Sequence, residues 1–391
     1  MYKICKRCVM DTSDPDIKFD EYGFCNHCTS AISALKNLTF SGDEAKKRLC
    51  ENIDKIREEG KNNKYDCLIG LSGGVDSSYL AYKCKEWNLR PLLFHVDGGW
   101  NTPQSEHNVQ AIADYLGYPL ERYVVNWDEM RDLHRSFLAA GVPNQDIPQD
   151  HLFFATLFKI AKERGVRYWL SGSNYISESI LPKAWGGYAM DAYHLKAIHN
   201  QFGTIRLRTY PILSFFEYCK YYTTLGKNCI YRIDLLNFLP YDPYKARIEL
   251  QQACGWKDYG GKHGESIFTR FFQNYFLPQR FGFDKRKAHL SSLIVANQLS
   301  RTEALNILQQ SSYPAELLEK DKKIVLRKLG YTEKEFNEIL NSPLHKHSDY
   351  KNSQGFINFA WKVKTLQNAL YLIKEGKFKI FFKKLLSKFK K

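Results

Sequence analysis

The stretch that decides the fold is CLIGLSGGVDSSYLAYKC, residues 67–84. Its apolar start, 68–71, suits a buried strand, and the residues from Val75 onward suit a helix. Between them, Gly73 and Gly74 let backbone N–H groups approach an anion closely, and the helix start adds its positive end. The stretch therefore predicts a phosphate-binding loop between a strand and a helix.

The loop also carries hydroxyls and one carboxylate. Ser72, Ser77 and Ser78 can donate hydrogen bonds to phosphate oxygens. Asp76 would repel a phosphate unless a cation lay between them, so it implies Mg²⁺ close to the reacting phosphates. A Walker loop would carry a lysine that reaches the β- and γ-phosphates, and its absence here argues against γ-phosphoryl transfer.

Strand-like and helix-like segments alternate around this loop. Strands are expected at 66–71, 91–96, 122–125 and 167–170, and helices at 75–87, 103–116 and 150–164. Such alternation predicts an α/β fold with a parallel sheet and helices on both faces. Ligands of such sheets bind beyond the carboxyl ends of the strands. Two further motifs lie at those ends: HVDGGW at 95–100 and SGSN at 171–174.

The SGGVDSS loop, residues 72–78, resembles the signature of the PP-loop ATP pyrophosphatases, whose nucleotide domain is HUP-like. These enzymes split ATP between the α- and β-phosphates, adenylylate a substrate oxygen and release pyrophosphate. The resemblance implies ATP and Mg²⁺ as cofactors, with the loop holding pyrophosphate and with His95, Asp97 and Gly172 lining the adenosine pocket. A plain glycine turn in some other α/β protein is the alternative.

Four cysteines form two pairs near the start of the chain, Cys5-x-x-Cys8 and Cys25-x-x-Cys28, with 16 residues between the pairs. This spacing is typical of zinc sites. Four thiolates complete a tetrahedron and leave no position for water, so we expect a structural Zn²⁺. An iron–sulfur cluster or four unmetallated thiols are the alternatives.

A second polar cluster, residues 255–289, is rich in glycine, aromatic and basic residues. Lys262 and His263 stand between glycines, an arrangement that is costly to order unless the backbone passes close to another group. We expect these two to act on a departing pyrophosphate or sugar diphosphate, and Lys285 and Arg286 to bind phosphates. A solvated charged loop is the alternative.

Three stretches together resemble the N-acetyl sugar amidotransferases of bacterial surface-polysaccharide and nonulosonic acid pathways, including lipopolysaccharide and O-antigen synthesis. They are ICKRCVMDTSDP with FDEYGFCNHC, the SGGVDSS loop, and GWKDYGGKHGESIFTRFFQNYFLPQRFGFDKRKAHLS. The resemblance covers about residues 2–310. It implies that the substrate is an N-acetylated sugar, expected to be nucleotide-linked. The acetamido oxygen of this sugar would be adenylylated and replaced by ammonia. The products would be an acetamidino sugar, AMP and pyrophosphate.

The resemblance also implies partners. No glutaminase signature is found in the sequence, so ammonia would come from a separate glutaminase and a cyclase-like barrel subunit. A tRNA-modifying PP-loop enzyme of the thiolase or lysidine type is a rival reading. The spacing of Cys219, Cys229 and Cys254 counts against the thiolase, because no C-x-x-C pair is formed. A zinc-ribbon interaction protein with a degenerate loop is a second rival.

Four regions are expected: a zinc module plus helix at 1–60, the PP-loop domain at 61–240, a mostly helical domain at 241–373, and a basic amphipathic tail at 374–391. The net charge is +15, and the tail contributes eight lysines and one glutamate. The remaining charge is moderate, so a nucleic-acid partner is not required.

The tail places phenylalanines and leucines on one helical face and lysines on the other. This pattern predicts contact with an anionic membrane surface, with packing against protein as the alternative. The N-terminal residues lack the apolar core of a signal peptide, so a cytoplasmic location is expected. Membrane contact through the tail would then be at the inner face of the membrane.

Overall fold

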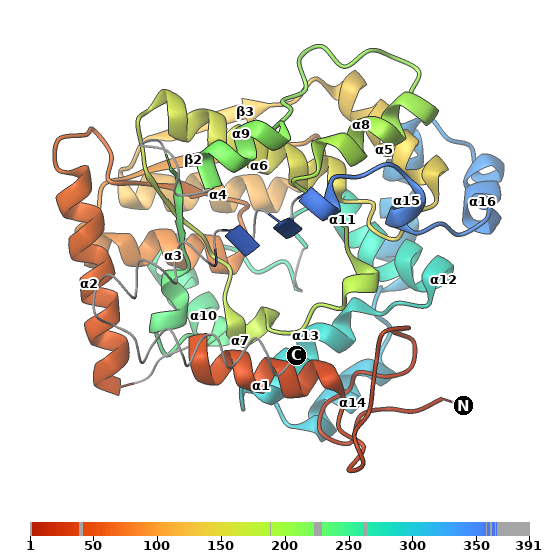
Figure 1. Ribbon diagram of the computed structural model, residues 1–391, viewed down its shortest axis with the longest axis horizontal. Helices are drawn as coiled ribbons and strands as arrows, with labels where there is room; N and C mark the ends of the chain where they lie inside the picture. The colour runs from red at the N-terminus through yellow and green to blue at the C-terminus, as the bar shows by residue number, and fades with distance from the viewer. Residues whose placement is uncertain are drawn as a thin grey trace.

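The predicted α/β fold is confirmed in the computed structural model (Figure 1). The structure describes residues 2–38, 42–187, 189–222, 229–260, 264–356, 358–359, 362–363 and 365. Lys262, His263 and the tail at 374–391 therefore lie outside the described residues. Five parallel strands form one sheet in the order β3-β2-β1-β4-β5. The strands are β1 (Cys67–Gly70), β2 (Pro91–Asp97), β3 (Leu120–Val124), β4 (Tyr168–Leu170) and β5 (Tyr231–Ile233).

The two faces of the sheet bury alternate residues of the same strands, as the period of two requires. Leu68 of β1 and Phe94 of β2 belong to one core, and Ile69 and Leu93 belong to the other. The first core is covered by α5 (Trp127–Ala140), α6 (Ile147–Glu163), α8 (Ala192–Phe202) and α9 (Phe215–Tyr222). The second is covered by α2 (Gly42–Gly60), α3 (Val75–Glu86), α4 (Pro103–Leu116) and α10 (Pro243–Cys254).

The strand order reverses between β1 and β4. From β1 the chain proceeds to β2 and β3 on one side, and β4 and β5 then extend the sheet on the other side. At such a reversal the loops that follow the two central strands diverge and leave a crevice at the carboxyl edge of the sheet. The SGGVDSS loop after β1 and the SGSN turn after β4 both lie at this crevice.

A third core lies beside the sheet and is largely built by the C-terminal helices, as predicted for a mostly helical region. Its aromatic residues include Phe268, Phe271, Phe276 and Phe336. The helices are α11 (Ile267–Phe271), the π-turn η3 (Phe272–Phe276), α12 (Leu277–Phe281), α13 (Lys285–Val295), α14 (Arg301–Gln309), α15 (Ala315–Leu329) and α16 (Glu333–Asn341). Helix α10 packs on α3 in the second core of the sheet. The chain beyond residue 240 therefore contributes both to the sheet domain and to the third core.

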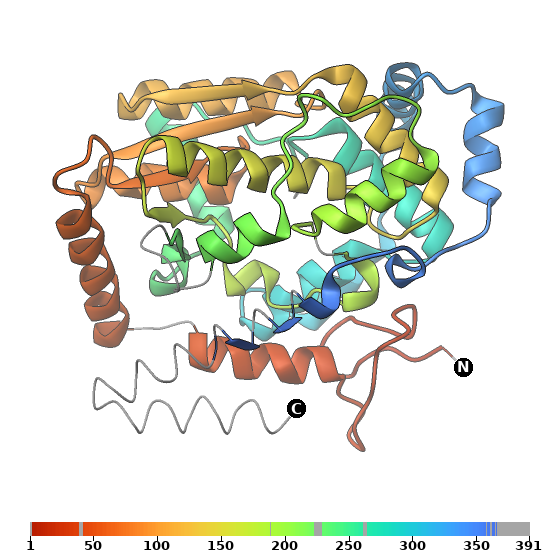
Figure 2. The same cartoon turned by 45° about the horizontal axis from the view of Figure 1, so that its top comes forward.

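The remaining elements are short or peripheral. Helix α1 (Asn26–Leu38) packs against α13 and α7 (Tyr175–Glu178), and α2 stands at one edge of the molecule, opposite α16 (Figure 2). Three 3₁₀ turns complete the list: η1 (Lys183–Trp185), η2 (Leu235–Phe238) and η4 (His347–Asp349). Among the described residues, no helix combines the length and the apolar character needed to cross a bilayer.

A buried ion pair joins α11 to α15. Arg270 donates from Nε and Nη2 to Asp321 Oδ2 at 2.8 and 2.7 Å, and the Tyr313 hydroxyl donates to the same oxygen at 2.5 Å. Asp321 is 1% exposed, so its charge depends on these donors. The positive charge of Arg270 thus neutralises the Asp321 carboxylate inside the protein.

We predict that Arg270→Met lowers the free energy of unfolding by about 3–5 kcal/mol, because the Asp321 carboxylate would stay buried without its cation. The matched control is Arg57→Met, whose exposed pair with Asp54 spans 3.5 Å and should cost less than about 1 kcal/mol. Urea unfolding of both variants measures the difference. Equal small losses would contradict the assignment.

Candidate functional site

A cavity of about 590 Å³ opens at the carboxyl ends of β1, β2 and β4. One part of its wall is apolar and aromatic, with Phe94, Phe153, Phe154, Leu157, Trp169 and Ile180. Another part is polar, with Asp146, Gln149, Asp150, Thr269, Lys285 and His289. Among the residues expected to bind nucleotide, Ser72, His95, Gly172 and Lys285 line this cavity.

The SGGVDSS loop has the backbone geometry of an anion site. Gly73 adopts φ +82°, and a Cβ there would lie 2.5 Å from the backbone oxygen of Ser105, so α4 leaves room for glycine alone. Gly74 is the N-cap of α3 and makes no side-chain cap hydrogen bond. The N–H groups of the first turn of α3 therefore keep their capacity to bind an anion. Ser72 Oγ accepts from the Gly74 N–H at 3.1 Å and lies 3.3 Å from Ser77 Oγ.

Gly172, after β4, faces this helix start from the other side of the crevice. A Cβ at Gly172 would lie 2.8 Å from the backbone nitrogen of Ser77 and 3.0 Å from the carbonyl carbon of Asp76. The missing side chain thus leaves open the space in front of a first-turn N–H group. The residues present fit a bound phosphate or pyrophosphate at this position.

Asp76 is held by two neighbours. Its Oδ1 accepts from the Tyr241 hydroxyl and, at 3.3 Å, from Asn174 Nδ2. Burial, and then the charge of Asp76, raise the pKa of Tyr241 well above its usual range, so its hydroxyl stays a donor. Glu178 and Glu265 bring two more carboxylates to the cavity wall. Oxygen donors of this kind suit Mg²⁺.

Ser78 and Asp97, both expected to bind nucleotide, are not among the described residues that line the cavity. Ser78 is fully buried, and within the described part of the chain its hydroxyl has no hydrogen-bond partner, so its contact with phosphate stays a prediction. Asp97 Oδ1 accepts from the Gly99 N–H at 2.7 Å. The structure gives Asp97 a role in shaping the turn after β2.

His95 is fixed from both ring nitrogens. Its Nδ1 lies 2.7 Å from the Leu71 carbonyl oxygen, and its Nε2 lies 2.8 Å from Glu106 Oε1. Glu106 Oε2 in turn accepts from Arg122 Nη1 at 2.7 Å. The hydrogen bond from His95 is the main cause that lowers the pKa of Glu106 to about 2. These contacts hold the imidazole rigidly at the cavity wall.

Described residues at the start of the second polar cluster pack against the phosphate loop, although nearly two hundred positions separate them in the chain. Trp256 Nε1 donates to the backbone carbonyl oxygen of Gly73 at 3.1 Å, and the Thr102 N–H donates to the backbone carbonyl oxygen of Glu265 at 2.9 Å. The Tyr259 hydroxyl lies 3.1 Å from the position that a Cβ of Gly74 would take. The described residues on both sides of Lys262 and His263 therefore adjoin the loop.

Lys285 and Arg286, the first two residues of α13, differ in position. Lys285 lines the cavity. Arg286 does not: its Nη2 donates to Asp284 Oδ2 at 2.7 Å, and its Nη1 donates to the Gln310 oxygen at 2.8 Å. Arg286 ties α13 to the end of α14, and its expected contact with phosphate stays a prediction.

Asp146 and Asp150 are functional candidates that the sequence did not single out. They belong to the N-terminal end of α6, where a carboxylate is expected merely as a helix-start residue. Burial, and then the nearby charge of Asp146, raise the pKa of Asp150 to about 7. Only the fold places these carboxylates beside Lys285 in the cavity.

Comparison with known proteins agrees with this geometry. Residues 265–367 match the domain family described as LPS biosynthesis protein WbpG-like, C-terminal domain. The NH(3)-dependent NAD(+) synthetase of Carboxydothermus hydrogenoformans is 28% identical over 125 residues, which are 32% of this chain and 49% of that protein. These two matches support the PP-loop ATP pyrophosphatase superfamily. The chain spans about half the length of this curated relative.

Two solved structures also align with this chain. NMN synthetase from Francisella tularensis is 13% identical, with a TM-score of 0.36, over 78% of this chain and 98% of that chain. The NH3-dependent NAD synthetase from Campylobacter jejuni is 15% identical, with a TM-score of 0.31, over 74% of this chain and 97% of that chain.

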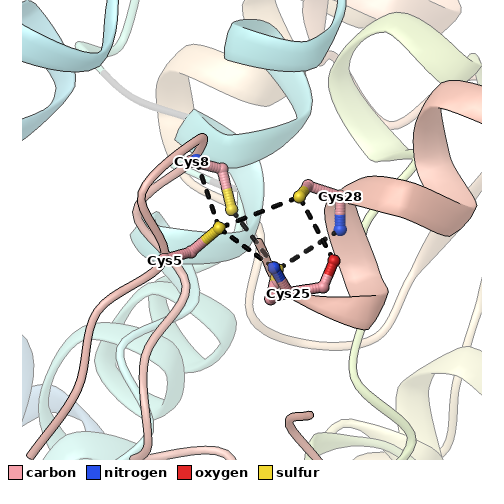
Figure 3. Close-up of side chains that lie close together, drawn as sticks. All are labelled: Cys5, Cys8, Cys25 and Cys28. Carbon is pink, nitrogen blue, oxygen red and sulfur yellow. Dashed lines mark hydrogen bonds between the residues drawn. The ribbon is translucent and has the colours of Figure 1, made fainter. Parts of the chain in front are cut away.

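The four N-terminal cysteines converge on one point, Cys5 and Cys8 from a loop and Cys25 and Cys28 from the start of α1 (Figure 3). Their sulfur atoms all lie within 4.8 Å of one another, at 3.8 Å for Cys5–Cys28 and 3.6 Å for Cys8–Cys25. Zn–S bonds of about 2.3 Å in a tetrahedron would separate sulfurs by about 3.8 Å. The cluster can hold a metal, and its size fits zinc.

This cysteine cluster is coupled to the cavity through α13. The Val9 N–H donates to Ser291 Oγ at 3.1 Å, and Lys287 Nζ lies 2.5 Å from the buried carboxylate of Asp11. The same helix carries Lys285 and His289, which line the cavity. A metal in the cluster would therefore stabilise the position of these two side chains.

We predict that Gly172→Ala weakens ATP binding at least about tenfold, or about 1.4 kcal/mol. The added methyl group would need the space in front of the Ser77 N–H, where it meets backbone rather than a flexible side chain. Titration calorimetry with ATP measures the effect. Gly355→Ala is the control, because a Cβ there meets nothing within 4 Å. Unchanged affinity in Gly172→Ala would contradict the phosphate site.

We predict that the purified chain carries one metal ion and that Cys25→Ser loses it, because three thiolates bind far more weakly than a closed tetrahedron. Elemental analysis by mass spectrometry gives the metal and its amount. Cys50→Ser, which changes an exposed cysteine outside the cluster, should keep the ion. Full metal content in Cys25→Ser would rule out the cluster as the site.

Proposed function

We propose that the protein is an ATP-dependent amidotransferase of lipopolysaccharide or related surface-sugar synthesis. It adenylylates the acetamido oxygen of an N-acetylated, nucleotide-linked sugar and replaces that oxygen with ammonia, releasing AMP and pyrophosphate. The observation that carries the proposal is the opening of the phosphate loop into a cavity large enough for a second substrate. The WbpG-like match over residues 265–367 and the ammonia-dependent relative support the pathway and the nitrogen donor.

The chemistry explains why ATP would be needed. An amide carbonyl is a poor electrophile, and its oxygen is a poor leaving group. Attack of that oxygen on the α-phosphorus breaks the bond to pyrophosphate and leaves AMP on the oxygen. Ammonia then adds to the carbon, and AMP departs with the oxygen. No covalent enzyme nucleophile is required.

The loop supplies charge stabilisation for the first step. N–H groups at the start of α3, and the hydroxyls of Ser72 and Ser77, would bind the pyrophosphate as negative charge gathers on it. Mg²⁺ held at Asp76 would neutralise phosphate charge when bound. Lys285 lies on the same cavity wall and would attract an anionic part of either substrate. Lys262 and His263 retain their proposed role beside the departing group.

The cavity also suits a sugar. Trp169 and Phe153 offer aromatic surface to the apolar face of a ring, and Gln149 and Thr269 offer hydrogen-bond partners to its hydroxyl and amide groups. Orientation of the acetamido oxygen toward the α-phosphate would contribute much of the rate. A separate glutaminase and a cyclase-like barrel would deliver ammonia, and the basic tail would bring the complex to the membrane's inner face.

We predict that the protein, given ATP, Mg²⁺, ammonium and an acetamido sugar, forms AMP and pyrophosphate in equal amounts. The sugar product should be lighter by the difference between O and NH. UDP-linked diacetamido sugars and nine-carbon acetamido keto sugars are the substrates to compare by mass spectrometry. The matched control sugar carries a free amine in place of the acetamido group and should give no AMP. ADP as the nucleotide product would overturn the proposal.

A further inference from the structure

Asp146 and Asp150 lie one helical turn apart on the cavity wall, and the backbone N–H of Asp150 donates to the backbone carbonyl oxygen of Asp146 at 2.9 Å. Their side chains differ in their surroundings. Asp146 accepts from Gln149 Nε2 at 3.2 Å, from Thr269 Oγ1 at 3.2 Å and from Gln273 Nε2 at 3.4 Å. The carboxylate of Asp150 has no hydrogen-bond partner among the described residues, although it faces the cavity.

We propose that Asp150 is the general base that accepts a proton from the attacking ammonia. The inference rests on the proposed function and adds the residue that completes its second step. Ammonia forms a C–N bond to the adenylylated acetamido carbon and becomes a positively charged substituent. One N–H proton moves to the carboxylate of Asp150. The C–O bond to AMP then breaks, AMP keeps the electron pair, and an amidinium group remains on the sugar.

The position of Asp150 suits this task better than the positions of Asp146 and Glu265, which also line the cavity. Asp146 is fixed by three donors, and Glu265 adjoins Gly74 at the phosphate loop, where negative charge already gathers. A base must be free to form a new hydrogen bond with the proton that it takes. Asp150 meets that requirement within the described structure, and Asp146 beside it would stabilise the positive charge of the amidinium product.

Burial and the charges around Asp150 set the pH at which it can act. Burial disfavours its ionised form most, Asp146 disfavours that form further, and Lys285 on α13 favours it. Tyr210 packs behind α6 and donates its hydroxyl to the Pro148 oxygen, and the other titratable groups on the cavity wall are His95, Glu178, Glu265 and His289. With its pKa raised to about 7, Asp150 is ionised above neutral pH and protonated below it. Base catalysis by Asp150 should therefore fade as the pH falls through 7.

The test separates the two chemical steps. Exchange of labelled pyrophosphate into ATP, measured with sugar and without ammonia, reports adenylylation. Formation of the amidine with ammonia reports the whole reaction. We expect Asp150→Asn to keep exchange within about threefold of the wild type and to lose about 10²-fold or more in amidine formation. Asp54→Asn, on the exposed face of α2, is the matched control and should change neither rate.

Two further readouts exclude a merely structural role. At a fixed concentration of free ammonia, the wild-type rate should rise through pH 7, and Asp150→Asn should lose that rise. Formate should partly restore amidine formation in Asp150→Ala, because it supplies a carboxylate in the space vacated by the side chain. If the asparagine variant does not fold, the alanine variant and the wild-type pH profile still carry the test.

The outcomes distinguish this inference from the proposed function. A wild-type protein that catalyses no sugar-dependent exchange overturns the proposed function and the role of Asp150 together. A wild-type protein that forms amidine, with Asp150→Asn equally fast and equally dependent on pH, overturns the inference alone. Equal loss of exchange and of amidine formation would also overturn it, because Asp150 would then serve substrate binding or adenylylation.

Discussion

The first turn of α3, which begins without a capping side chain, is the feature on which the rest of the site depends. A helix start normally gains a capping side chain, but Gly74 provides none. The loop can stay uncapped because Gly73 tolerates a left-handed backbone against α4 and because Gly172 leaves space on the opposite side. Each glycine removes a side chain that would otherwise fill the place of an anion.

The sheet places this local feature at the edge of the cavity that both substrates of the proposed reaction would share. Reversal of strand order between β1 and β4 opens the crevice at the carboxyl edge, and α6 and α11 build its outer walls. Negative charge is then distributed unevenly around it: Asp76 lies at the phosphate loop, and Asp146 and Asp150 lie on α6. This separation suits a reaction with an anionic leaving group at one place and a cationic product at another.

The C-terminal helices and the cysteine cluster act as supports for this arrangement. The described residues 255–260 and 264–266 lie beside the phosphate loop through Trp256 and Glu265, and α13 carries Lys285 into the cavity. Contacts of α13 with Val9 and Asp11 tie it to the cysteine cluster. Loss of metal from the cluster would thus change the position of Lys285 in the cavity, although none of the ten cysteines, all of them in the described part of the chain, lines the cavity.

The sequence by itself determined the local features, because these depend on neighbours in the chain. The strand–loop–helix of residues 67–86, the helix at 103–116 and the convergent cysteine pairs follow from periodicity, glycine positions and ligand spacing. It did not reveal β5, whose three residues carry too weak a pattern and become a strand only by pairing with β4. Tertiary structure alone decided that Arg286 binds Asp284 while its neighbour Lys285 enters the cavity. It also decided that Asp150 is a base candidate, because proximity to Asp146 and removal from water are properties of the folded cavity and not of the order of residues.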